Sequence, residues 1–273
     1  MIRRNSCDLS SLQSLLRRCI DEKDLIEGTY LHSLLSKQGR LNQDPALCKL
    51  LIELYHKCGC DHKSMDLFSS IPFRHDPVLW NSIISFQSRL GHHHMALQIY
   101  IQMIIEGVFP SKVTFVCIFP VCAKMKFFEE GRRIHVRVLE SGFASDVVVG
   151  TAIMNMYGRC ESIDYAYMVF NHMPSHDVVA WNAILTLYAQ LQEGIEAIKL
   201  FVRMLLNDAV MPDSITFVSI LNACANEGVS REGMLIHCLI LGSIGIVDVA
   251  METALIHMYG KWGAFDDAFS VFI

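Results

Sequence analysis

The sequence predicts an all-α protein, a right-handed α-solenoid of tandem helix–turn–helix repeats of about 31–36 residues each. Three observations support this prediction. The motif Trp-Asn-small-Ile occurs at Trp80 and again at Trp181, 101 residues later. Segments that flank the two motifs recur at nearly the same interval, and apolar residues within each copy follow the period of a helix.

The flanking segments establish the repeat because three independent pairs share one offset of 102 residues. The pairs are VTFVCIFPVCA from Val113 with ITFVSILNACA from Ile215, TAIMNMYGRC from Thr151 with TALIHMYGKW from Thr253, and EEGRRIH ending at His135 with REGMLIH ending at His237. Weaker copies lie upstream, so that Tyr55, Tyr157 and Tyr259 are equally spaced, and His32 falls at the position of His135 and His237. We expect these histidines to share a packing role rather than a catalytic one.

Each interval divides into subunits of about 35, 35 and 31 residues with one internal plan. An apolar-periodic stretch comes first, and a Gly or polar break follows. A second stretch then carries a small residue and an aromatic residue four positions apart, on one helix face. These pairs are Ala96 and Tyr100, Ala166 and Phe170, Ala197 and Phe201, and Ala268 and Phe272. The breakers EGVFPS, SGFASD, HMPSHD and AVMPDS end the second helix.

Composition narrows the class of protein. Of the 273 residues, 52% are hydrophobic and 19% are charged, which excludes a disordered chain. The net charge of −5 and the pI of about 6.2 count against a uniformly basic nucleic-acid binder, but they are compatible with a local basic groove. No run of eighteen uncharged apolar residues occurs, so we expect no membrane insertion.

The details of the repeat resemble those of pentatricopeptide repeat proteins. The pattern WNAILTLYAQ…AIKLFVRM…P, with Met103, Met173 and Met204 late in the second helix, carries this resemblance. The alternation of repeat lengths resembles the land-plant subfamily with P, L and S repeats (PLS). TFVSILNACA…GMLIH is similar to its long type, and TAIMNMYGRC…AYMVFNHMP is similar to its short type. The resemblance covers nearly the whole chain, without the C-terminal E/deaminase extension of many relatives.

In this register a short N-terminal segment precedes eight repeats. Residues 1–8 form that segment, a possible weak targeting signal. The repeats are L 9–44, S 45–76, P 77–111, L 112–146, S 147–177, P 178–213, L 214–248 and a truncated S 249–273.

The resemblance implies that the fifth and the last residue of a repeat together choose one RNA base. An amide at the fifth position carries both donors and an acceptor for a base edge. The assignments are Asn81 with Ser111 for a pyrimidine, favouring C; Thr151 with Asp177 for G; Asn182 with Asp213 for U; and Thr253, whose partner is missing, for a purine.

The second residue of a repeat is implied to sandwich the bases, and here it is Val78, Val148 or Val179. The long repeats carry Val116 and Val218 at the fifth position, and valine cannot hydrogen-bond a base. We therefore treat the long repeats as spacers, and the implied site is 5′-C-n-G-U-n-purine-3′, where n is unread.

Two alternatives remain open for these residues. Asn81 and Asn182 lie near helix starts, where an asparagine can satisfy free backbone N–H groups instead of contacting a base. The three valines have the alternative of being ordinary core residues. The basic residues whose placement bears on RNA binding are Lys124, Lys126, Arg132, Arg133 and Arg137.

No chemistry-bearing constellation is present. His92, His93 and His94 are adjacent and cannot share one ion from one helix face, and a deaminase would need H-x-E and C-x-x-C in suitable places. We expect no catalytic residues, no enzymatic activity, no cofactor and no metal site.

The leading hypothesis is sequence-selective binding of single-stranded RNA in organellar RNA metabolism, whether editing-site recognition, processing or stability. A trans-acting editing or processing factor is then a possible partner. The location is a mitochondrion or a chloroplast, with the mitochondrion favoured. The alternative is a protein–protein interaction scaffold, or a truncated paralogue that has lost specific RNA binding. The uncapped C-terminal repeat would permit self-association.

Overall fold

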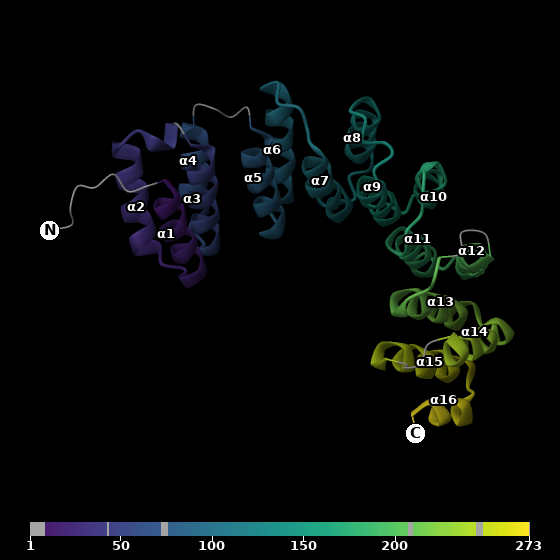
Figure 1. Cartoon of the computed structure of the whole chain (residues 1–273). Coiled ribbons are helices and arrows are strands. Elements are labelled where there is room, and N and C mark those ends of the chain that lie inside the picture. The colour runs from purple at the N-terminus through teal and green to yellow at the C-terminus, as the bar shows by residue number, and fades with distance from the viewer. Residues whose placement is uncertain (1–8, 43, 72–75, 207–209, 244–247, 273) are drawn as a thin grey trace. The chain divides into compact units, whose positions relative to one another are not determined.

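A computed structural model describes residues 9–42, 44–71, 76–206, 210–243 and 248–272. The N-terminal segment 1–8, with its possible targeting signal, lies outside this part. Within the described residues the chain is helical and has no strand, which confirms the predicted class (Figure 1). None of the helices formed by these residues has both the length and the apolar character needed to cross a bilayer.

The helices follow one another in pairs along the chain. Their bounds are α1 Leu9–Glu22, α2 Leu25–Lys37, α3 Pro45–Lys57, α4 Asp61–Ser70, α5 Pro77–Arg89, α6 His93–Ile105, α7 Lys112–Met125, α8 Phe128–Glu140, α9 Val147–Arg159, α10 Ile163–His172, α11 Val178–Gln190, α12 Gly194–Leu206, α13 Ser214–Glu227, α14 Ser230–Ser243, α15 Val249–Trp262 and α16 Phe265–Phe272, with a 3₁₀ turn at Arg40–Asn42. The odd-numbered helices, the first of each pair, begin at the first residues of the repeats predicted from the sequence.

An aspartate precedes most of the first helices and explains where they begin. Its side chain accepts a backbone N–H of the first turn at 2.8–3.1 Å. These caps are Asp44, Asp76, Asp146, Asp177, Asp213 and Asp248. Such a cap stabilises a helix by about 1 kcal/mol. The last residue of a repeat therefore also starts the next helix, a role that the repeat register alone does not reveal.

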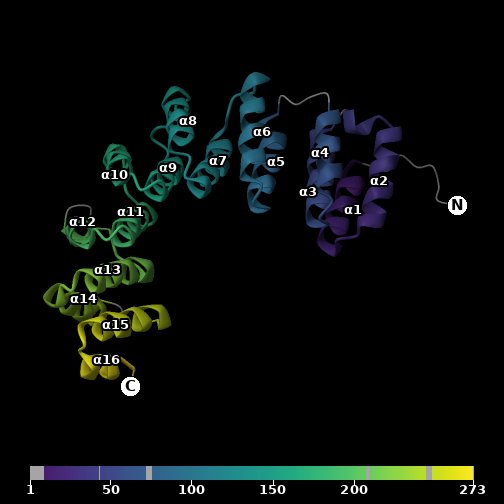
Figure 2. The ribbon, with the colours of Figure 1, turned by 180° about the vertical axis from the view of Figure 1, so that it is seen from behind.

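Contacts divide the chain into two compact units, Met1–Val121 and Cys122–Ile273. In the first unit α3 packs between α1 and α5, while α4 and α6 pack on α3 and α5. In the second unit α9, α11, α13 and α15 form a row, as both views show (Figures 1 and 2). Helices α10, α12, α14 and α16 pack on this row. Within each unit the first helices thus form one layer, and the second helices cover one of its sides.

The two repeated tryptophans form the centre of the packing between repeats. Trp80 and Trp181 are both fully buried, as expected for side chains between neighbouring repeats. The Trp80 ring meets Phe68 of α4 edge-on at 4.8 Å between centroids, and the Trp181 ring meets Phe170 of α10 in the same way at 4.7 Å. Equivalent residues thus make equivalent contacts in the two units.

The small and aromatic pairs of the second helices behave as predicted where they are described. Ala96, Ala166 and Ala197 are fully buried, and their aromatic partners are at most 3% exposed. Ala268 is half-buried, and the side chain of Phe272 lies outside the described residues. The spacing of four therefore marks the face that packs on the first helices.

The repeated histidines join consecutive repeats, which confirms their predicted packing role. The Nδ1 atoms of His32, His135 and His237 lie 2.6, 3.0 and 2.9 Å from the hydroxyls of Tyr55, Tyr157 and Tyr259. Burial lowers the pKa of all three histidines. Burial also raises the pKa of Tyr55 and of Tyr157 to about 12. The rings are therefore neutral and the hydroxyls protonated at neutral pH, so that each pair forms an uncharged hydrogen bond.

Candidate nucleic-acid interface

Asn182 lies one turn into α11, next to the buried Trp181, and its amide is held on both sides. Its Nδ2 donates to the two carboxylate oxygens of Asp213 at 2.9 and 3.1 Å. Its Oδ1 accepts from the hydroxyl of Thr216 at 2.5 Å. Asp213 and Thr216 also exchange the two hydrogen bonds of a capping box at the start of α13. The fifth residue of this repeat and its last residue are therefore in direct contact.

The Asp213 carboxylate is ionised at neutral pH. Burial opposes its charge, but hydrogen bonds from the Thr216 amide, the Asn182 amide, the Thr216 hydroxyl and the Ile215 amide outweigh burial and lower the pKa of Asp213. An ionised carboxylate accepts hydrogen bonds and donates none. The Asp213 carboxylate therefore requires the NH₂ group of the Asn182 amide to point towards it.

Asn81 occupies the equivalent place in α5 but has different partners. Its Nδ2 donates to the Ser111 hydroxyl at 3.1 Å. Its Oδ1 is buried and has no hydrogen-bond partner among the described residues. Thr114, which stands where Thr216 stands 102 residues later, contacts the Ser111 hydroxyl at 3.1 Å. The two asparagine sites thus share a position in the fold and differ in how the amide is held.

The structure rejects helix capping as the role of these two asparagines. Asp76 and Asp177 cap α5 and α11, and the amides of Asn81 and Asn182 make side-chain contacts across to the start of the next repeat. Both asparagines are 7% exposed, and among the described residues they belong to a small set of buried polar side chains.

The threonine positions do not form comparable pairs. The Thr151 hydroxyl donates to the Val147 carbonyl of its own helix at 2.8 Å. Asp177 is exposed and caps α11. No hydrogen bond joins its described atoms to Thr151, so the structure gives no support for their pairing. Thr253 is exposed, and its hydroxyl donates to the Val249 carbonyl at 2.6 Å. Thr151 and Asp177 thus lie near the starts of the neighbouring helices α9 and α11, without a hydrogen bond between their described atoms.

The three valines lie on the surface, so the alternative that they are core residues is wrong. Val78, Val148 and Val179 are 45%, 50% and 59% exposed. Each precedes a fifth-position residue by three, on the same face of its helix. Each valine therefore leaves apolar surface open to solvent beside the fifth residue of its repeat.

A groove of about 670 Å³ opens between α3, α5 and α7 within the first unit. Its walls carry Val78, Asn81 and Ser111, three residues predicted from the sequence to contact bases. They also carry Val113, Lys49 and Arg89, for which the sequence predicted no contact with RNA. The signal for Val113 was available, because it is the second residue of its repeat as Val78 is. Lys49 is the fifth residue of its repeat, as Asn81 is of the next, so the repeat register already placed it in the same row. Arg89 is brought beside Asn81 by the packing of helices.

The charge of this groove is positive although the chain is acidic. Lys49 and Arg89 face one acid, Glu53. Burial, with the nearby Arg89 charge second, lowers the pKa of His56 in the groove wall to about 3, so that this ring is neutral at pH 7. Two cations and one anion leave a net positive charge beside Asn81 and Ser111.

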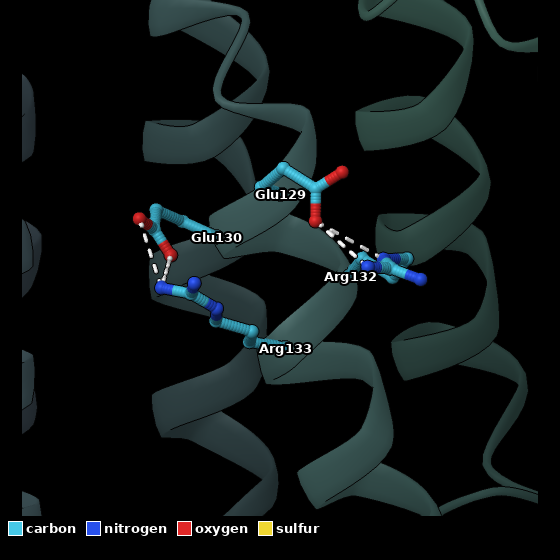
Figure 3. Close-up of polar contacts among 4 residues, drawn as sticks. All are labelled: Glu129, Glu130, Arg132 and Arg133. Carbon is cyan, nitrogen blue, oxygen red and sulfur yellow. Dashed lines mark hydrogen bonds and ion pairs between the residues drawn. The ribbon is translucent and has the colours of Figure 1, made fainter.

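The basic residues singled out in the sequence are arranged differently. Arg132 and Arg133 of α8 form ion pairs with Glu129 and Glu130 of the same helix, at 2.9 and 3.0 Å (Figure 3). Lys126 pairs with Glu161 at 2.5 Å. Helix α8 is a second helix and packs on α9. These cations are therefore neutralised, and Arg132 and Arg133 lie on the helix layer that lacks the asparagines.

No cluster of His, Cys, Asp or Glu suited to a metal ion occurs among the described residues.

Comparison with known proteins identifies the repeats. A model of the PPR repeat family matches residues 176–226, and the PPR repeat model matches residues 78–108, 151–178 and 253–273. The chain is 34% identical over 259 residues to the pentatricopeptide repeat-containing protein At1g11290, chloroplastic, of Arabidopsis thaliana, covering 94% of the chain and 32% of that relative. It is 31% identical over 268 residues to At4g25270, chloroplastic, of the same plant, covering 97% and 49%. The chain thus spans about a third to a half of the length of these relatives.

Solved structures with the same fold include the pentatricopeptide repeat protein PPR10. The protein PPR10 in complex with an 18-nt psaJ RNA element superposes with a TM-score of 0.72 at 15% identity, over 98% of this chain and 40% of that one. PPR10 from maize gives 0.67 at 18% identity, over 97% and 39%. Nuclear proteinaceous RNase P 2 from A. thaliana gives 0.54 at 14% identity, over 69% and 42%. Identities this low establish the fold alone. The matches to the repeat models and to the Arabidopsis relatives place the chain in the pentatricopeptide repeat family.

Proposed function

We propose that this chain binds single-stranded RNA and reads it with one base per reading repeat. The observation that carries the proposal is the contact of the Asn182 amide with Asp213, at the fifth and last positions of one repeat. In such a pair each side chain offers one polar group to the edge of a base, and the exposed Val179 supplies an apolar surface for the face of the base. The PPR10 complex, whose fold this chain shares, contains RNA.

The reading residues of the proposal are Asn81 with Ser111, Thr151 with Asp177, Asn182 with Asp213, and Thr253. Val78, Val148 and Val179 would sandwich bases, and the implied target remains 5′-C-n-G-U-n-purine-3′. Val113 extends the apolar row into a long repeat, because it is 55% exposed in the groove beside Asn81.

We assign the chain to the PLS subfamily and to organellar RNA metabolism. The repeat lengths support the subfamily, and three Arabidopsis relatives carry the word chloroplastic in their names. These names support an organellar location and give no support to the mitochondrial preference. The chain would supply the RNA address for editing, processing or stabilisation and recruit a trans-acting factor for the chemistry.

Replacing Asn182 with threonine tests the base assignment. The variant Asn182→Thr recreates the Thr-Asp combination assigned to G, so the preference at the facing base is expected to change from U to G. One good base contact is worth about 1–3 kcal/mol of discrimination. Fluorescence anisotropy at about 100 mM salt, with RNAs that differ only at that base, measures the change.

A permuted RNA of the same composition is the control for the Asn182 experiment. Equal weak binding of the wild-type chain to every RNA, or no binding, would contradict the proposed function and favour the protein–protein scaffold.

Replacing Lys49 and Arg89 together with glutamine tests the groove as the path of the phosphates. Each phosphate contact to a single strand contributes about −0.7 to the slope of log K against log salt. The double variant is therefore expected to flatten that slope by about 1.4. It should weaken binding to all RNAs alike and leave the preference at Asn182 unchanged, because phosphates carry no sequence.

The matched control is the double variant Arg132→Gln/Arg133→Gln on α8, where both cations are already ion-paired. A flattening as large in the α8 variant as in the groove variant would show that the groove is not the phosphate path.

A further inference from the structure

A pocket of about 560 Å³ lies between α2 and α4, on the second-helix layer of the first unit. Both helices pack on α3, whose Tyr55 lines the pocket together with His32, the partner of its hydroxyl at 2.6 Å. The walls are one face of each second helix, formed by Thr29, Ser33 and Ser36 of α2 and by Lys63, Asp66, Leu67 and Ser70 of α4. No predicted base-reading residue lines this pocket, so it is separate from the groove beside Asn81.

The α2 wall is polar where the corresponding walls of the second unit are apolar. Ser33 and Ser36 stand one and four residues after His32. The residues at the same distances from the other two repeated histidines are Val136 and Leu139, and Cys238 and Leu241. The polarity of this wall is therefore specific to the first junction and is not required by the repeat fold.

Lys63 keeps the pocket open at a place that aromatic rings occupy in the second unit. It follows Tyr55 by eight residues, as Tyr165 follows Tyr157. The Tyr165 ring stacks on Tyr157 at 5.2 Å between centroids, and Phe128 meets Tyr165 edge-on at 5.4 Å. At the first junction the Lys63 ammonium instead lies 5.9 Å from the centroid of the Tyr55 ring. A cation with three N–H donors thus borders the pocket in place of a stacked phenol.

Two opposite charges in this pocket are unpaired. Lys63 is half-buried, and its ammonium has neither an ion pair nor a hydrogen bond among the described residues. Asp66 lies three residues further along α4, and its carboxylate likewise has no partner among these residues. The His32–Tyr55 pair is uncharged. The pocket therefore offers one positive and one negative group, with no net charge.

The hydroxyls of the pocket add both donors and acceptors. Thr29 and Ser70 each donate their hydroxyl proton to a carbonyl of their own helix, at 3.0 and 2.7 Å, so their oxygens remain as acceptors. Ser33 and Ser36 form no side-chain hydrogen bond among the described residues, so their hydroxyls are able to donate. Each wall therefore carries a donor and an acceptor.

We propose that this pocket binds a free α-amino acid as a zwitterion. Lys63, with Ser33 and Ser36, binds the carboxylate, and Asp66 binds the ammonium group. A dianion such as a phosphate monoester would be repelled by the Asp66 carboxylate, and an organic cation would be repelled by the Lys63 ammonium. A ligand that carries both signs satisfies both residues, and the volume of the pocket falls within the range of small-molecule sites.

Thermal unfolding of the full chain without RNA, in the presence of each common α-amino acid at millimolar concentration, tests the proposal. At least one amino acid is expected to raise the melting temperature by roughly 3 °C at about ten times its Kd, because a ligand that binds only the folded state stabilises it. No shift with any amino acid would overturn the proposal.

Calorimetric titration then compares the amino acid that binds with two of its analogues, one without the α-amine and one without the carboxylate. Each analogue is expected to bind about tenfold more weakly, since each leaves one charge of the pocket unpaired. Equal binding of the analogue without the amine would show a simple anion site and would also overturn the proposal.

Three variants locate the binding in this pocket. Lys63→Gln is expected to weaken binding about tenfold. Asp66→Asn should remove the advantage of the amino acid over the analogue without the amine. Lys63→Tyr introduces the residue found at this position in the second unit, and its ring should stack on Tyr55, fill the pocket and abolish binding without lowering the melting temperature.

The matched control is Lys199→Gln, which removes an exposed lysine of α12 and should leave the affinity for the amino acid unchanged. Unchanged affinity in both Lys63 variants would overturn the proposal. The RNA affinity of all these variants should equal that of the wild type, so the outcome for this pocket is measured separately from the outcome for the proposed function.

Discussion

Replacing Trp181 with alanine is expected to lower the free energy of unfolding around α10–α12 by about 3–5 kcal/mol, the usual cost of removing a large buried aromatic side chain. The indole is fully buried, edge-on to Phe170 at 4.7 Å. The Arg203 guanidinium lies 5.6 Å from the indole ring and adds a cation–π contact. The indole N–H has no acceptor among the described residues, so the loss comes from packing.

Urea denaturation followed by far-UV circular dichroism measures the change in stability, and hydrogen exchange localises it to the repeats involved. Local readout matters because the repeats of a solenoid contact only their neighbours and need not unfold together. Val179→Ala is the control, since this side chain lies two residues earlier in the same helix and is 59% exposed. It should change stability by less than about 0.5 kcal/mol. A loss below about 1 kcal/mol for Trp181→Ala would contradict the central packing role of the tryptophan.

The two substitutions also separate stability from reading. Asn182 follows Trp181 in the chain and owes its place to the anchored indole. Trp181→Ala should therefore disturb stability and base preference together, whereas Val179→Ala should weaken RNA binding in a stable protein. Such different outcomes would show that the buried face of α11 sets its stability and position, and that its exposed face contacts RNA.

The repeat plan was predictable from sequence because its landmarks recur. Trp80 and Trp181 carry the same flanks, so one argument places both as core residues and puts each following asparagine at the fifth position. The same periodicity predicted that His32, His135 and His237 pack alike. Proline does not break this pattern: Pro120 lies inside α7, on its exposed side, where the register requires a continuous helix.

Contacts between helices were not predictable in the same way. Thr114 and Thr216 occupy one repeat position, yet only Thr216 reaches the asparagine of the preceding repeat. The difference arises because the last residue of the repeat is Ser111 in one case and Asp213 in the other, which changes the hydrogen bonds available at that junction. Arg89 joins Lys49 in one groove because α3 and α5 pack together, and the repeat position of Arg89 does not predict it there. The ion pairs of α8 were available in the sequence, because EEGRR places opposite charges three residues apart.

The variant Gly158→Val is expected to destabilise the junction of α9 and α11 by about 3 kcal/mol, at the upper end of the usual cost of overpacking. A Cβ atom at Gly158 would lie 2.2 Å from Leu187 Cδ2, 2.6 Å from Cδ1 and 2.8 Å from Cγ. Leu187 is only 5% exposed, so its side chain has little room to move away. The absence of a side chain at Gly158 is therefore what permits α9 and α11 to approach.

Three further variants make this explanation specific. Gly260 stands at the same repeat position, 102 residues later, and a Cβ atom there would meet nothing within 4 Å. Gly260→Val should therefore cost little, since valine is the better helix former of the two. Leu187→Ala alone should cost about 2–5 kcal/mol, but combined with Gly158→Val it should cost less than the sum, with a coupling of about 0.5–3 kcal/mol. Additive losses by urea denaturation would exclude the steric explanation.

Gly158→Val, the double variant with Leu187→Ala, and Gly260→Val also connect helix spacing to RNA reading. Thr151 lies on α9 and Asn182 on α11, so the separation of these helices sets the separation of two proposed reading side chains. Consecutive bases of a single strand must meet both side chains at once. Discrimination at both positions should therefore fall in Gly158→Val and recover in the double variant, while Gly260→Val retains it. A recovery of stability without a recovery of discrimination would show that α9 and α11 can pack at more than one spacing, of which only one reads RNA.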